Sequence, residues 1–494
     1  MEAPSNPHLA LLRFSGEIGT KARATRSQFV QRLVANLRNA LLAEELEPRI
    51  HNTHNRIFVE LPDAACASVL TRVFGIQSIS LVERRPADSI ERLVDAGEEL
   101  FGSHVAGKRF AVRARRVGER SKITLLPSDI ERELGTRLLS GSAGVDLNNP
   151  EETVYIELMG NDAYFFRERL PCHGGIPLGS SGRAIALMSG GFDSAVAAWQ
   201  LLKRGVRIDY AFCKLGGETH QEGVLRVAKL LADQWSYGDQ PRLHSIDFGA
   251  VTEELRARTR ERYWQILLKR LMVRAAEILV RERRASAIVT GDAVGQVSSQ
   301  TLPNLAVISR ATTETILRPL IGSNKDEIID TARLIGTYDL SKIVREYCAM
   351  VPTRPSTAAT LEAIEAEEAK IDLSIVEAAV TARKIFKLRE LDLDTLGVPD
   401  LEVSRIPEGA TVIDLRSKPE FQDWHWPNAL HLDFGQALKT YANFERNKTY
   451  VLYCEIGLKS AHLAEFMRKE GLRALHVPGG LKTLKKMEAR PDNR

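Results

Sequence analysis

Residues 187–199 read LMSGGFDSAVAAW, and this stretch decides the fold of the largest part of the chain. The residues before it, RAIALM (183–188), predict a buried strand, and SAVAAWQLLKR (194–204) predicts a helix. Between them, Gly190 and Gly191 allow the backbone to turn sharply and to approach a ligand closely. Free N–H groups at the start of a helix attract anions. The strand, turn and helix together therefore predict a phosphate-binding loop.

The loop differs from the commonest phosphate-binding motif. It contains no lysine or arginine, and the chain has no G-x-x-x-x-G-K-[ST] motif, so transfer of a γ-phosphate by that machinery is not expected. Ser189 and Ser194 can add hydroxyl donors to the backbone N–H groups. A glycine-rich turn in which Asp193 or Ser194 merely caps a helix is the alternative interpretation.

The segments that follow repeat the strand-then-helix order. Four more strands are predicted, with helical segments between most of them: VRIDYAF (206–212), RLHSIDF (242–248), SAIVTGDA (286–293) and ETILRPLIG (314–322). Repeated units of this kind predict a parallel, doubly wound sheet with helices on both faces. The fold class expected for the whole chain is therefore α/β and multidomain, with smaller α+β domains before this sheet and a small α/β domain after it.

The 494 residues suggest about three or four domains. Pattern changes place their boundaries at 1–75, 76–172, 173–395 and 396–494, with the glycine- and serine-rich HGGIPLGSSGR (173–183) as one junction. The first two segments mix strands with helices, and the last is a new α/β pattern. Residues 357–395 are charged and poor in turn residues, so a helical connector is expected there.

A cationic strand is predicted in the second segment. Seven basic residues and one acid lie between Lys108 and Lys122, and Phe110, Val112 and Ala114 alternate with cations. Like charges aligned on one face repel unless an anion shares them, so this face is a candidate for binding nucleic-acid phosphates. An ordinary solvated strand face is the alternative. The candidate contact residues are Lys108, Arg109, Arg113 and Arg115.

Composition excludes several classes of protein. Apolar residues make up 44% and charged residues 27% of the chain, its net charge is +4, and it has no apolar run of about 18 residues that could span a membrane. The N-terminus lacks the features of a secretory signal. The five cysteines form no C-x-x-C pair, so neither a disulfide framework nor a zinc or iron–sulfur site is expected, and a reducing cytoplasm is the expected location. These cysteines are Cys66, Cys172, Cys213, Cys348 and Cys454.

Cys454 lies directly after the apolar strand TYVLY (449–453) and before EIGLKS (455–460) and a helix. A thiol at such a turn faces backbone N–H groups and a helix N-terminus, which favour an anionic, reactive sulfur. Seen without its surroundings, a cysteine after a strand is more often part of a core.

Several motifs in order resemble one family. SGGFDS (189–194) is similar to the S-G-G-x-D-S signature of the PP-loop ATP pyrophosphatases. With GEIGTK (16–21), TGDAVGQVSSQT (290–301) and EYCAMVPTRP (346–355), the chain resembles the tRNA 4-thiouridine synthetases over almost its entire length. The resemblance implies a ferredoxin-like domain over 1–75, a THUMP RNA-binding domain over 76–172, a PP-loop domain over 173–395 and a rhodanese-like domain over 396–494. C-x-x-G-x-x-S at Cys454 resembles the rhodanese loop, although many rhodaneses have arginine where this chain has Glu455.

The resemblance implies ATP and Mg²⁺ as cofactors and adenylation as the chemistry. Asp193 would be catalytic, orienting Mg²⁺ or the loop, and Lys269 would face the phosphates. No metal ion held by protein residues alone is expected. The residues implied to bind the nucleotide are Leu187, Met188, Ser189, Gly190, Gly191, Asp193, Ser194, Lys269, Gly291 and Gln300.

The resemblance also implies an ATP-dependent tRNA sulfurtransferase acting on uridine at position eight of tRNA. A cysteine desulfurase would load Cys454 with persulfide sulfur, ATP would activate the uridine carbonyl, and sulfur would replace the oxygen. Cys348 would then resolve the carrier in a Cys348–Cys454 disulfide, although a structural role for Cys348 is the alternative.

A second task implied by the resemblance is sulfur transfer to a small thiamine-pathway sulfur-carrier protein. The other hypotheses are a PP-loop ATP-dependent ligase acting on a small molecule and an inactive tRNA-binding or sulfur-carrier protein. No membrane partner is expected, and the oligomeric state is left open, a homodimer included.

Overall fold

The computed structural model describes residues 8–53, 56–118, 125–344, 352, 354–393, 396 and 401–488. The chain divides into two compact units. The first holds residues 1–181 with the short segments 202–206 and 237–239, and the second holds the rest. No helix in the described part of the chain is long and apolar enough to cross a membrane.

The first unit is built on one nine-stranded sheet with the order β2-β3-β1-β4-β8-β7-β5-β6, and β9 pairs with β4. The long strand β4 joins its halves, because Ile76–Val82 pairs with β1 and Glu83–Pro86 pairs with β8. The strands are β1 (His8–Phe14), β2 (Arg49–Asn52), β3 (Ile57–Leu61), β4 (Ile76–Pro86), β5 (Arg109–Arg116), β6 (Gly144–Val145), β7 (Glu152–Met159), β8 (Asp162–Phe166) and β9 (Leu170–Pro171).

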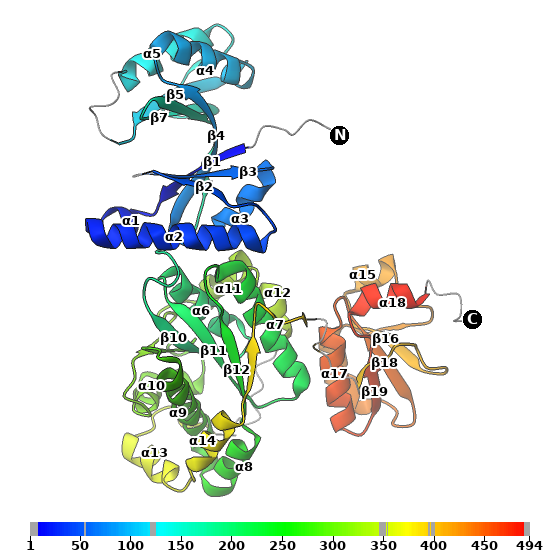
Figure 1. Ribbon diagram of the computed structural model, residues 1–494. Helices are drawn as coiled ribbons and strands as arrows, with labels where there is room; N and C mark the ends of the chain where they lie inside the picture. Colours follow the sequence, from blue (N-terminus) through cyan, green and yellow to red (C-terminus); the bar gives the residue numbers. More distant parts are fainter. Residues whose placement is uncertain are drawn as a thin grey trace. The chain divides into compact units, whose positions relative to one another are not determined.

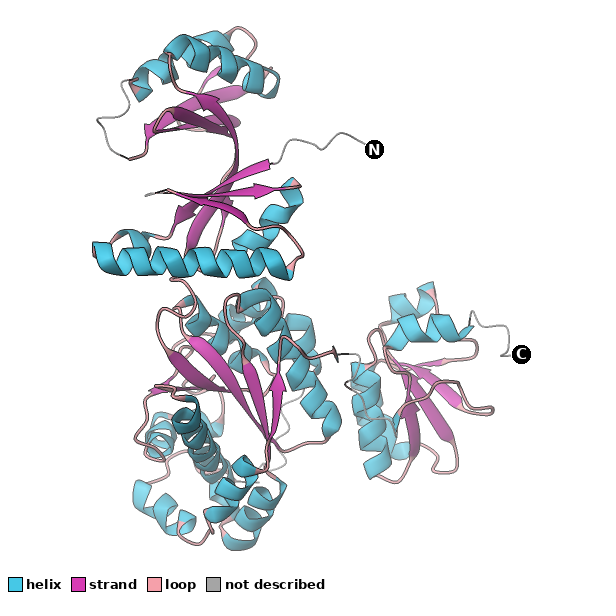
Figure 2. Ribbon diagram, viewed as in Figure 1, coloured by secondary structure: helices cyan, strands magenta, loops and turns pink. Residues whose placement is uncertain are grey.

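Each half of this sheet packs its own helices. Apolar residues of β1 and β3 form a core with those of α2 and α3, and β5, β7 and β8 form a separate core with α4 and α5. A smaller apolar cluster that includes Leu11, Phe58, Tyr164 and Phe166 draws on both halves. The helices, drawn in cyan in Figure 2, are α1 (Gly16–Gly19), α2 (Arg23–Ala43), α3 (Ala67–Thr71), α4 (Ile90–Val105) and α5 (Pro127–Leu139).

The second unit contains the sheet predicted from residues 187–199. Its order is β14-β13-β10-β11-β12-β15, and every pair is parallel except β12 with β15. Because the strands are parallel, their carboxyl ends, and the loops that follow, meet at one edge. The strands are β10 (Arg183–Leu187), β11 (Arg207–Lys214), β12 (Arg242–Asp247), β13 (Ile288–Val289), β14 (Ile316–Leu317) and β15 (Lys384–Lys387).

Helices cover both faces of this sheet, as the doubly wound fold requires (Figure 1). The long helix α9 packs on β10, β11 and β13, and α7 packs on β11 and β12. The helices are α6 (Phe192–Lys203), α7 (Glu218–Trp235), α8 (Gly249–Arg258), α9 (Trp264–Arg283), α10 (Leu302–Ser309), α11 (Lys325–Leu334), α12 (Tyr338–Ile343), α13 (Leu361–Glu368) and α14 (Ser374–Thr381).

The segment 357–395 is not a separate connector. Its residues Ile364, Ile371, Val376 and Val380 are buried in the same core as α9, and β15 pairs with β12. The high charge that suggested a connector lies mostly on outward positions, while these spaced apolar residues supply an inward face.

Residues 401–488 form a small α/β fold with a parallel sheet of order β17-β16-β18-β19 and its own cores. The strands are β16 (Thr411–Asp414), β17 (Leu430–His431), β18 (Thr449–Tyr453) and β19 (Arg473–His476). The helices are α15 (Lys418–Asp423), α16 (Phe434–Thr440), α17 (Leu458–Lys469) and α18 (Gly480–Glu488).

Candidate functional site

The predicted phosphate loop is a tight turn between β10 and α6. Gly190 has φ +80°, and a Cβ there would lie 2.8 Å from Val344 Cγ1, so glycine is required both for the turn and for space. The Gly191 N–H donates to Ser189 Oγ at 3.3 Å, and Ser194 Oγ donates to the Gly191 carbonyl at 3.1 Å. The N–H groups that open α6 are thus presented by a preorganised loop.

Asp193, in the first turn of α6, is held by two side chains from other loops. Lys325 Nζ lies 2.8 and 3.0 Å from its carboxylate oxygens, and Gln296 Nε2 donates at 2.9 Å. Lys325 and Gln296 were not predicted as site residues. The available signal was their position after β14 and β13, at the same edge of the sheet as the loop.

A second carboxylate, Asp292, organises the other cations of this edge. Lys269 Nζ lies 2.8 Å from Oδ1, and Arg318 Nε lies 3.3 Å from Oδ2. Thr290 Oγ1 and Gln300 Nε2 donate to the same carboxylate at 2.7 and 3.2 Å. Burial alone would raise the pKa of Asp292, but the charge of Lys269 and these hydrogen bonds lower it to about 2. Asp292 is therefore a permanent anion that holds Lys269 and Arg318 in place.

The structure brings Gly291 into contact with the loop. A Cβ at Gly291 would lie 2.7 Å from the Asp193 carbonyl carbon and 2.8 Å from the Ser194 nitrogen, so only glycine allows the end of β13 to pack against α6. The Met188 N–H donates to the Ala211 carbonyl at 2.9 Å, so this N–H is not available to a ligand. Leu187 ends β10 and is partly exposed.

The charges at this edge suit a nucleoside triphosphate. Three cations, Lys269, Arg318 and Lys325, lie there with two carboxylates, so the side chains carry a net charge of +1 beside a helix N-terminus. Gln300 Oε1 is buried, and no hydrogen-bond donor of a described residue reaches it. It is an acceptor available to a donor group of a bound nucleotide. Among the described residues, no group of three or more acidic, histidine or cysteine side chains could hold a metal ion.

Cys454 lies where the sequence places it, directly after β18 and before α17. Its Sγ is 3.7 Å from Ser460 Oγ, and Gly457 (φ +88°) forms the turn into the helix. The Leu481 N–H donates to the carbonyls of Cys454 and Glu455 at 3.0 and 3.1 Å. Cys454 is only 2% exposed, so its thiol is covered in this conformation, contrary to the accessible thiol expected of a sulfur carrier.

Charged side chains surround the Cys454 loop. Arg416 forms a buried ion pair with Asp414, with Nη2 and Oδ2 2.7 Å apart. Another nitrogen of its guanidinium, Nη1, lies 3.9 Å from the carboxylate of Glu455, which is 60% exposed. Glu455 departs from the arginine that many rhodaneses have at this position, and its closeness to Arg416 was not predicted from the sequence.

Of the remaining cysteines, Cys66 and Cys172 are partly exposed and Cys213 is buried. Cys348, and with it the predicted Cys348–Cys454 disulfide, lies outside the described residues. Burial raises the pKa of Cys172 to about 12 and that of Cys213 further. Both thiols are therefore unreactive, as expected for cysteines without a chemical role.

The four cations predicted to bind RNA lie on or beside β5, and each has a partner within the protein. Arg109 pairs with Asp146 at 3.2 Å, and Lys108 lies 3.7 Å from Glu152. Arg113 donates to the Leu147 carbonyl. Arg115 pairs with the buried Glu157, although its side chain is still 45% exposed.

Glu157 on β7 is surrounded by arginines from both halves of the first unit. Arg13 on β1 lies 2.8 Å from it, and Arg56, just before β3, lies 2.9 Å from it. Burial would raise the pKa of Glu157, but Arg13, Arg56 and Arg115 lower it to about 2. Three cations on one carboxylate leave a local excess of positive charge beside β5.

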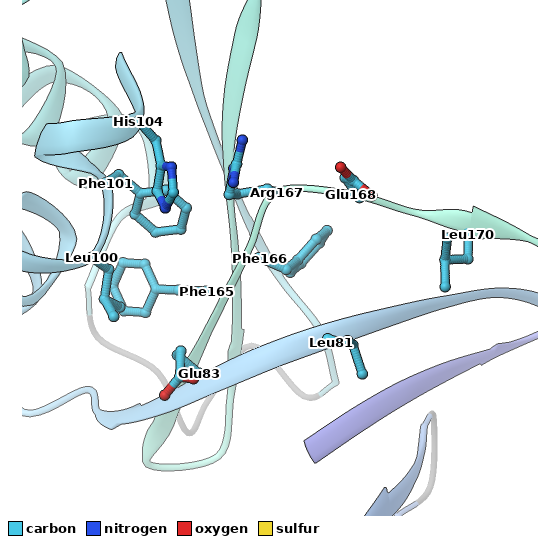
Figure 3. Close-up of a pocket in the computed structure, with 10 residues that line it drawn as sticks. All are labelled: Leu81, Glu83, Leu100, Phe101, His104, Phe165, Phe166, Arg167, Glu168 and Leu170. Carbon is cyan, nitrogen blue, oxygen red and sulfur yellow. The ribbon is translucent and has the colours of Figure 1, made fainter. Parts of the chain in front are cut away.

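A pocket of about 400 Å³ opens in the first unit, between α4, β4 and the end of β8 (Figure 3). Phe101, Phe165 and Phe166 give it an aromatic wall, and Arg167 lies at its edge. Arg167 is linked to the predicted RNA-binding strand, because Glu152 accepts from Arg167 at 2.8 Å and faces Lys108.

Four family models match the chain in one order. They are the ThiI ferredoxin-like domain (residues 9–80), the THUMP domain (87–167), the thiamine biosynthesis protein ThiI (179–373) and the rhodanese-like domain (401–487). With the loop geometry, these matches define a class of enzyme that joins an RNA-binding unit, a PP-loop nucleotide site and a rhodanese-like fold.

Proteins with similar sequences identify the family within this class. The chain is 39% identical over 466 residues to a tRNA sulfurtransferase of Pyrobaculum aerophilum, covering 93% of this chain and 94% of the relative. It is 35% identical over 476 residues to a tRNA sulfurtransferase of Thermoplasma acidophilum, covering 95% and 94%. The chain therefore belongs to the tRNA sulfurtransferase (ThiI) family.

A solved structure agrees with this assignment. A 4-thiouridine synthetase, crystallised in complex with RNA and with bound ATP, matches with a TM-score of 0.67 and 30% identity. The match covers 77% of this chain and 99% of that chain. The predicted family and fold class are thus confirmed, whereas the individual site residues and the exact domain boundaries stay predictions.

Proposed function

We propose that the chain uses ATP to activate a uridine of tRNA, at position eight, and replaces its O4 with sulfur carried by Cys454. The observation that carries the proposal is the arrangement at the edge of the parallel sheet. There the loop 189–194 opens α6 next to Lys269, Arg318 and Lys325. The loop has no cation of its own, and these three cations come from other parts of the chain.

In the activation step, the uridine O4 attacks the α-phosphorus of ATP, and pyrophosphate leaves with the electron pair of the broken bond. The cations and the N-terminus of α6 would stabilise the charge that develops on the leaving group. Mg²⁺, bound through ATP, would neutralise further charge on the phosphates. Asp193 would contribute by orienting Lys325 and the loop.

In the displacement step, sulfur from a Cys454 persulfide attacks C4, and AMP leaves. The terminal sulfur attacks either directly or after release as bisulfide. In either case the Cys348 thiolate would attack Cys454 Sγ, the S–S bond would break with its electron pair on the departing sulfur, and a Cys348–Cys454 disulfide would form. A cellular thiol reductant would reduce this disulfide before a cysteine desulfurase reloads Cys454. Because Cys454 is covered, the cycle requires a conformational change that exposes its thiol.

RNA binding is assigned to the first unit. The excess of arginines around Glu157 and the half-exposed Lys108, Arg109 and Arg115 support contacts with backbone phosphates. The bound RNA of the related 4-thiouridine synthetase complex supports the same assignment. Location in the cytoplasm stays an expectation from the sequence, and the oligomeric state stays open, a homodimer included.

A second activity is favoured by one observation. The family model that matches residues 179–373 is described as a thiamine biosynthesis protein. We therefore propose that Cys454 also supplies sulfur to a small thiamine-pathway carrier protein. This activity would need Cys454 and not the cationic strand β5.

The experiment that tests the main proposal mixes ATP with unmodified tRNA and follows pyrophosphate and the mass of the RNA. Wild-type protein should release pyrophosphate and, with a cysteine desulfurase and cysteine, add the mass difference between sulfur and oxygen. Cys454→Ser and Cys348→Ser should bind tRNA but lose thiolation, and Asp193→Ala should lose pyrophosphate release. Full thiolation by Cys348→Ser would remove the disulfide step, and the absence of tRNA-dependent pyrophosphate release would refute the proposal.

A further inference from the structure

Charged side chains lie beside loop 455–457, which follows Cys454. Their arrangement is unusual for a site that receives anionic sulfur. Arg416 follows β16, whose end lies beside the end of β18, because Asp414 pairs with Tyr453 in the sheet. Its guanidinium donates to both oxygens of Asp414, at 3.0 and 2.7 Å, and is 5% exposed. Arg416 is therefore neutralised and covered, so it cannot serve as a binding site for an incoming anion.

The other cation near this loop is Lys459, in the first turn of α17. Hydrogen bonds from Ser417 hold the pKa of Glu420 below its usual range, and the charges of Arg416 and Lys459 act in the same direction. Asp414, Glu420 and Glu455 together outnumber Arg416 and Lys459 by one charge. Of the pair Arg416 and Glu455, only the Glu455 carboxylate is exposed to solvent, at 60%.

We propose that Glu455 is a specificity-determining residue that repels small dianionic sulfur donors such as thiosulfate and reserves Cys454 for sulfur carried on a polypeptide cysteine. The proposal rests on the carrier role proposed for Cys454. A dianion approaching within a few ångströms of an exposed carboxylate meets repulsion from both of its charges. A protein persulfide has at most one charge and gains binding energy from the surrounding protein surface.

The two loading reactions differ only in their leaving groups. With thiosulfate, the Cys454 thiolate attacks the outer sulfur, the S–S bond to Cys454 forms, and sulfite leaves with the electron pair of the broken S–S bond. With a protein persulfide, the same bond forms and the donor cysteine leaves as a thiolate. Cyanide then removes the outer sulfur from either product as thiocyanate and restores the Cys454 thiolate.

The test compares full-length wild-type protein with Glu455→Gln, which keeps the shape, and Glu455→Arg, which reverses the charge. Thiosulfate and cyanide serve as one substrate pair, and a cysteine desulfurase supplied with cysteine serves as the other donor. Glu455→Arg should raise kcat/KM for thiosulfate about tenfold or more, chiefly by lowering KM, and added salt should reduce the gain. Glu455→Gln should give a smaller rise. Neither variant should load faster from the desulfurase.

Glu470→Arg is the matched control, because Glu470 is exposed and lies at the other end of α17, with the same change of net charge. It should leave the thiosulfate kcat/KM unchanged. An unchanged value in both Glu455 variants, or an equal rise in the control, would overturn the proposal. Mass spectrometry of Cys454 after the wild-type reaction with the desulfurase distinguishes failure of the Glu455 proposal from failure of the carrier role proposed for Cys454. If persulfide forms there but the variants do not change specificity, only the role of Glu455 is wrong. If no persulfide forms, the carrier role itself fails.

Discussion

At the scale of single residues, the cations at the carboxyl edge of the parallel sheet are held by carboxylates. This edge, with Lys269, Arg318, Lys325, Asp193 and Asp292, is called the nucleotide edge below. Lys325 lies on Asp193, and Lys269 and Arg318 lie on Asp292. Each of these ion pairs keeps a long cationic side chain near the loop and so lowers the entropy lost when phosphate binds. The carboxylates are therefore positioning groups for the cations as much as sites of chemistry.

The first prediction concerns Lys325, the cation nearest to the loop that was not predicted from the sequence. Lys325→Met should lower the rate of tRNA-dependent pyrophosphate release by about a hundredfold, because the loop then loses a charge that stabilises the leaving group. Lys370→Met is the control, since Lys370 is similarly exposed and pairs with Glu367 away from the loop. Equal rates for both variants would contradict the assignment.

Gly291 allows a second prediction at this scale. Its substitution by alanine places a Cβ within 2.9 Å of three backbone atoms of Asp193 and Ser194, so the end of β13 must move away from α6. ATP should bind more weakly by titration calorimetry, and the protein should lose about 1 to 3 kcal/mol of stability through overpacking. Gly322→Ala is the matched control, because nothing lies within 4 Å of a Cβ at Gly322. Unaltered ATP binding by Gly291→Ala would refute this reading of the glycine.

The sequence predicted the loop well and its surroundings only in part. The spacing of SGGFDS reports local backbone geometry, so Gly190, Gly191 and Asp193 could be predicted from neighbouring residues. Lys325 and Arg318 could not, because their distance from the loop depends on the order of β10, β13 and β14 in the sheet. Strand order is a non-local property that periodicity does not report.

At the scale of elements, the first unit depends on a charge cluster where its two half-sheets meet. Glu157 lies on β7, while Arg13 and Arg115 lie on β1 and β5. A buried carboxylate with several partners is costly to disrupt, since removing its charge leaves the cations without compensation. The cluster therefore fixes the cationic strand β5 against the ferredoxin-like half.

This cluster gives a prediction with a defined pH dependence. The pKa of Glu157 falls from 4.5 to about 2 on folding, so its stabilising charge is fully present above about pH 4.5 and is lost as the pH falls toward 2. Glu157→Gln should weaken hydrogen-exchange protection in β1, β5 and β7 by about 3 kcal/mol at pH 7. The difference from wild type should shrink below pH 4.5.

The exposed Glu83, which pairs with Arg85, provides the control for Glu157. Glu83→Gln should leave protection in these strands unchanged at every pH. A Glu157→Gln effect that stayed constant down to pH 3 would show that the side chain acts through its shape and not its charge.

The strand β5 itself carries the next prediction. Arg113→Gln should weaken tRNA binding and lower the slope of log affinity against log salt concentration by about one, because one phosphate contact is lost. Arg92→Gln on α4 is the control, since Arg92 is an exposed arginine paired with Asp88. Filter-binding titrations at several salt concentrations give both slopes, and identical slopes would exclude Arg113 from the RNA contact.

Prediction of elements from periodicity succeeded where one face was clearly apolar. The strands and helices around the loop were found, but β15 was missed, because KIFK (384–387) is too short and too charged to show alternation. Its place in the sheet comes from pairing with β12. Local pattern therefore predicts an element only when that element carries its own hydrophobic face.

At the scale of the whole molecule, the proposed chemistry is divided between parts that have separate cores. The core of residues 401–488 draws only on residues of that segment, and the nucleotide edge has a core of its own. A part with a complete core can fold without its neighbours. The proposed sulfur carrier can thus be separated from the proposed activating site in an experiment.

The final prediction uses this separation. Protein truncated after residue 400 should still bind tRNA and release pyrophosphate, but it should not thiolate the RNA with a desulfurase as the sulfur source. Adding residues 401–494 as a second chain should restore thiolation in proportion to its concentration. Covalent attachment supplies an effective concentration on the order of millimolar, so a fragment at micromolar concentration should restore only a small fraction of the rate.

The Cys454→Ser form of the fragment is the control and should restore nothing. Full thiolation by the truncated protein alone, with sulfur from the desulfurase, would mean that sulfur reaches the uridine without Cys454. The two-site mechanism would then be wrong, although the nucleotide edge would keep its role in activation. Restoration that depends on both the fragment and its thiol would instead establish that the C-terminal fold delivers sulfur to a site built by the rest of the chain.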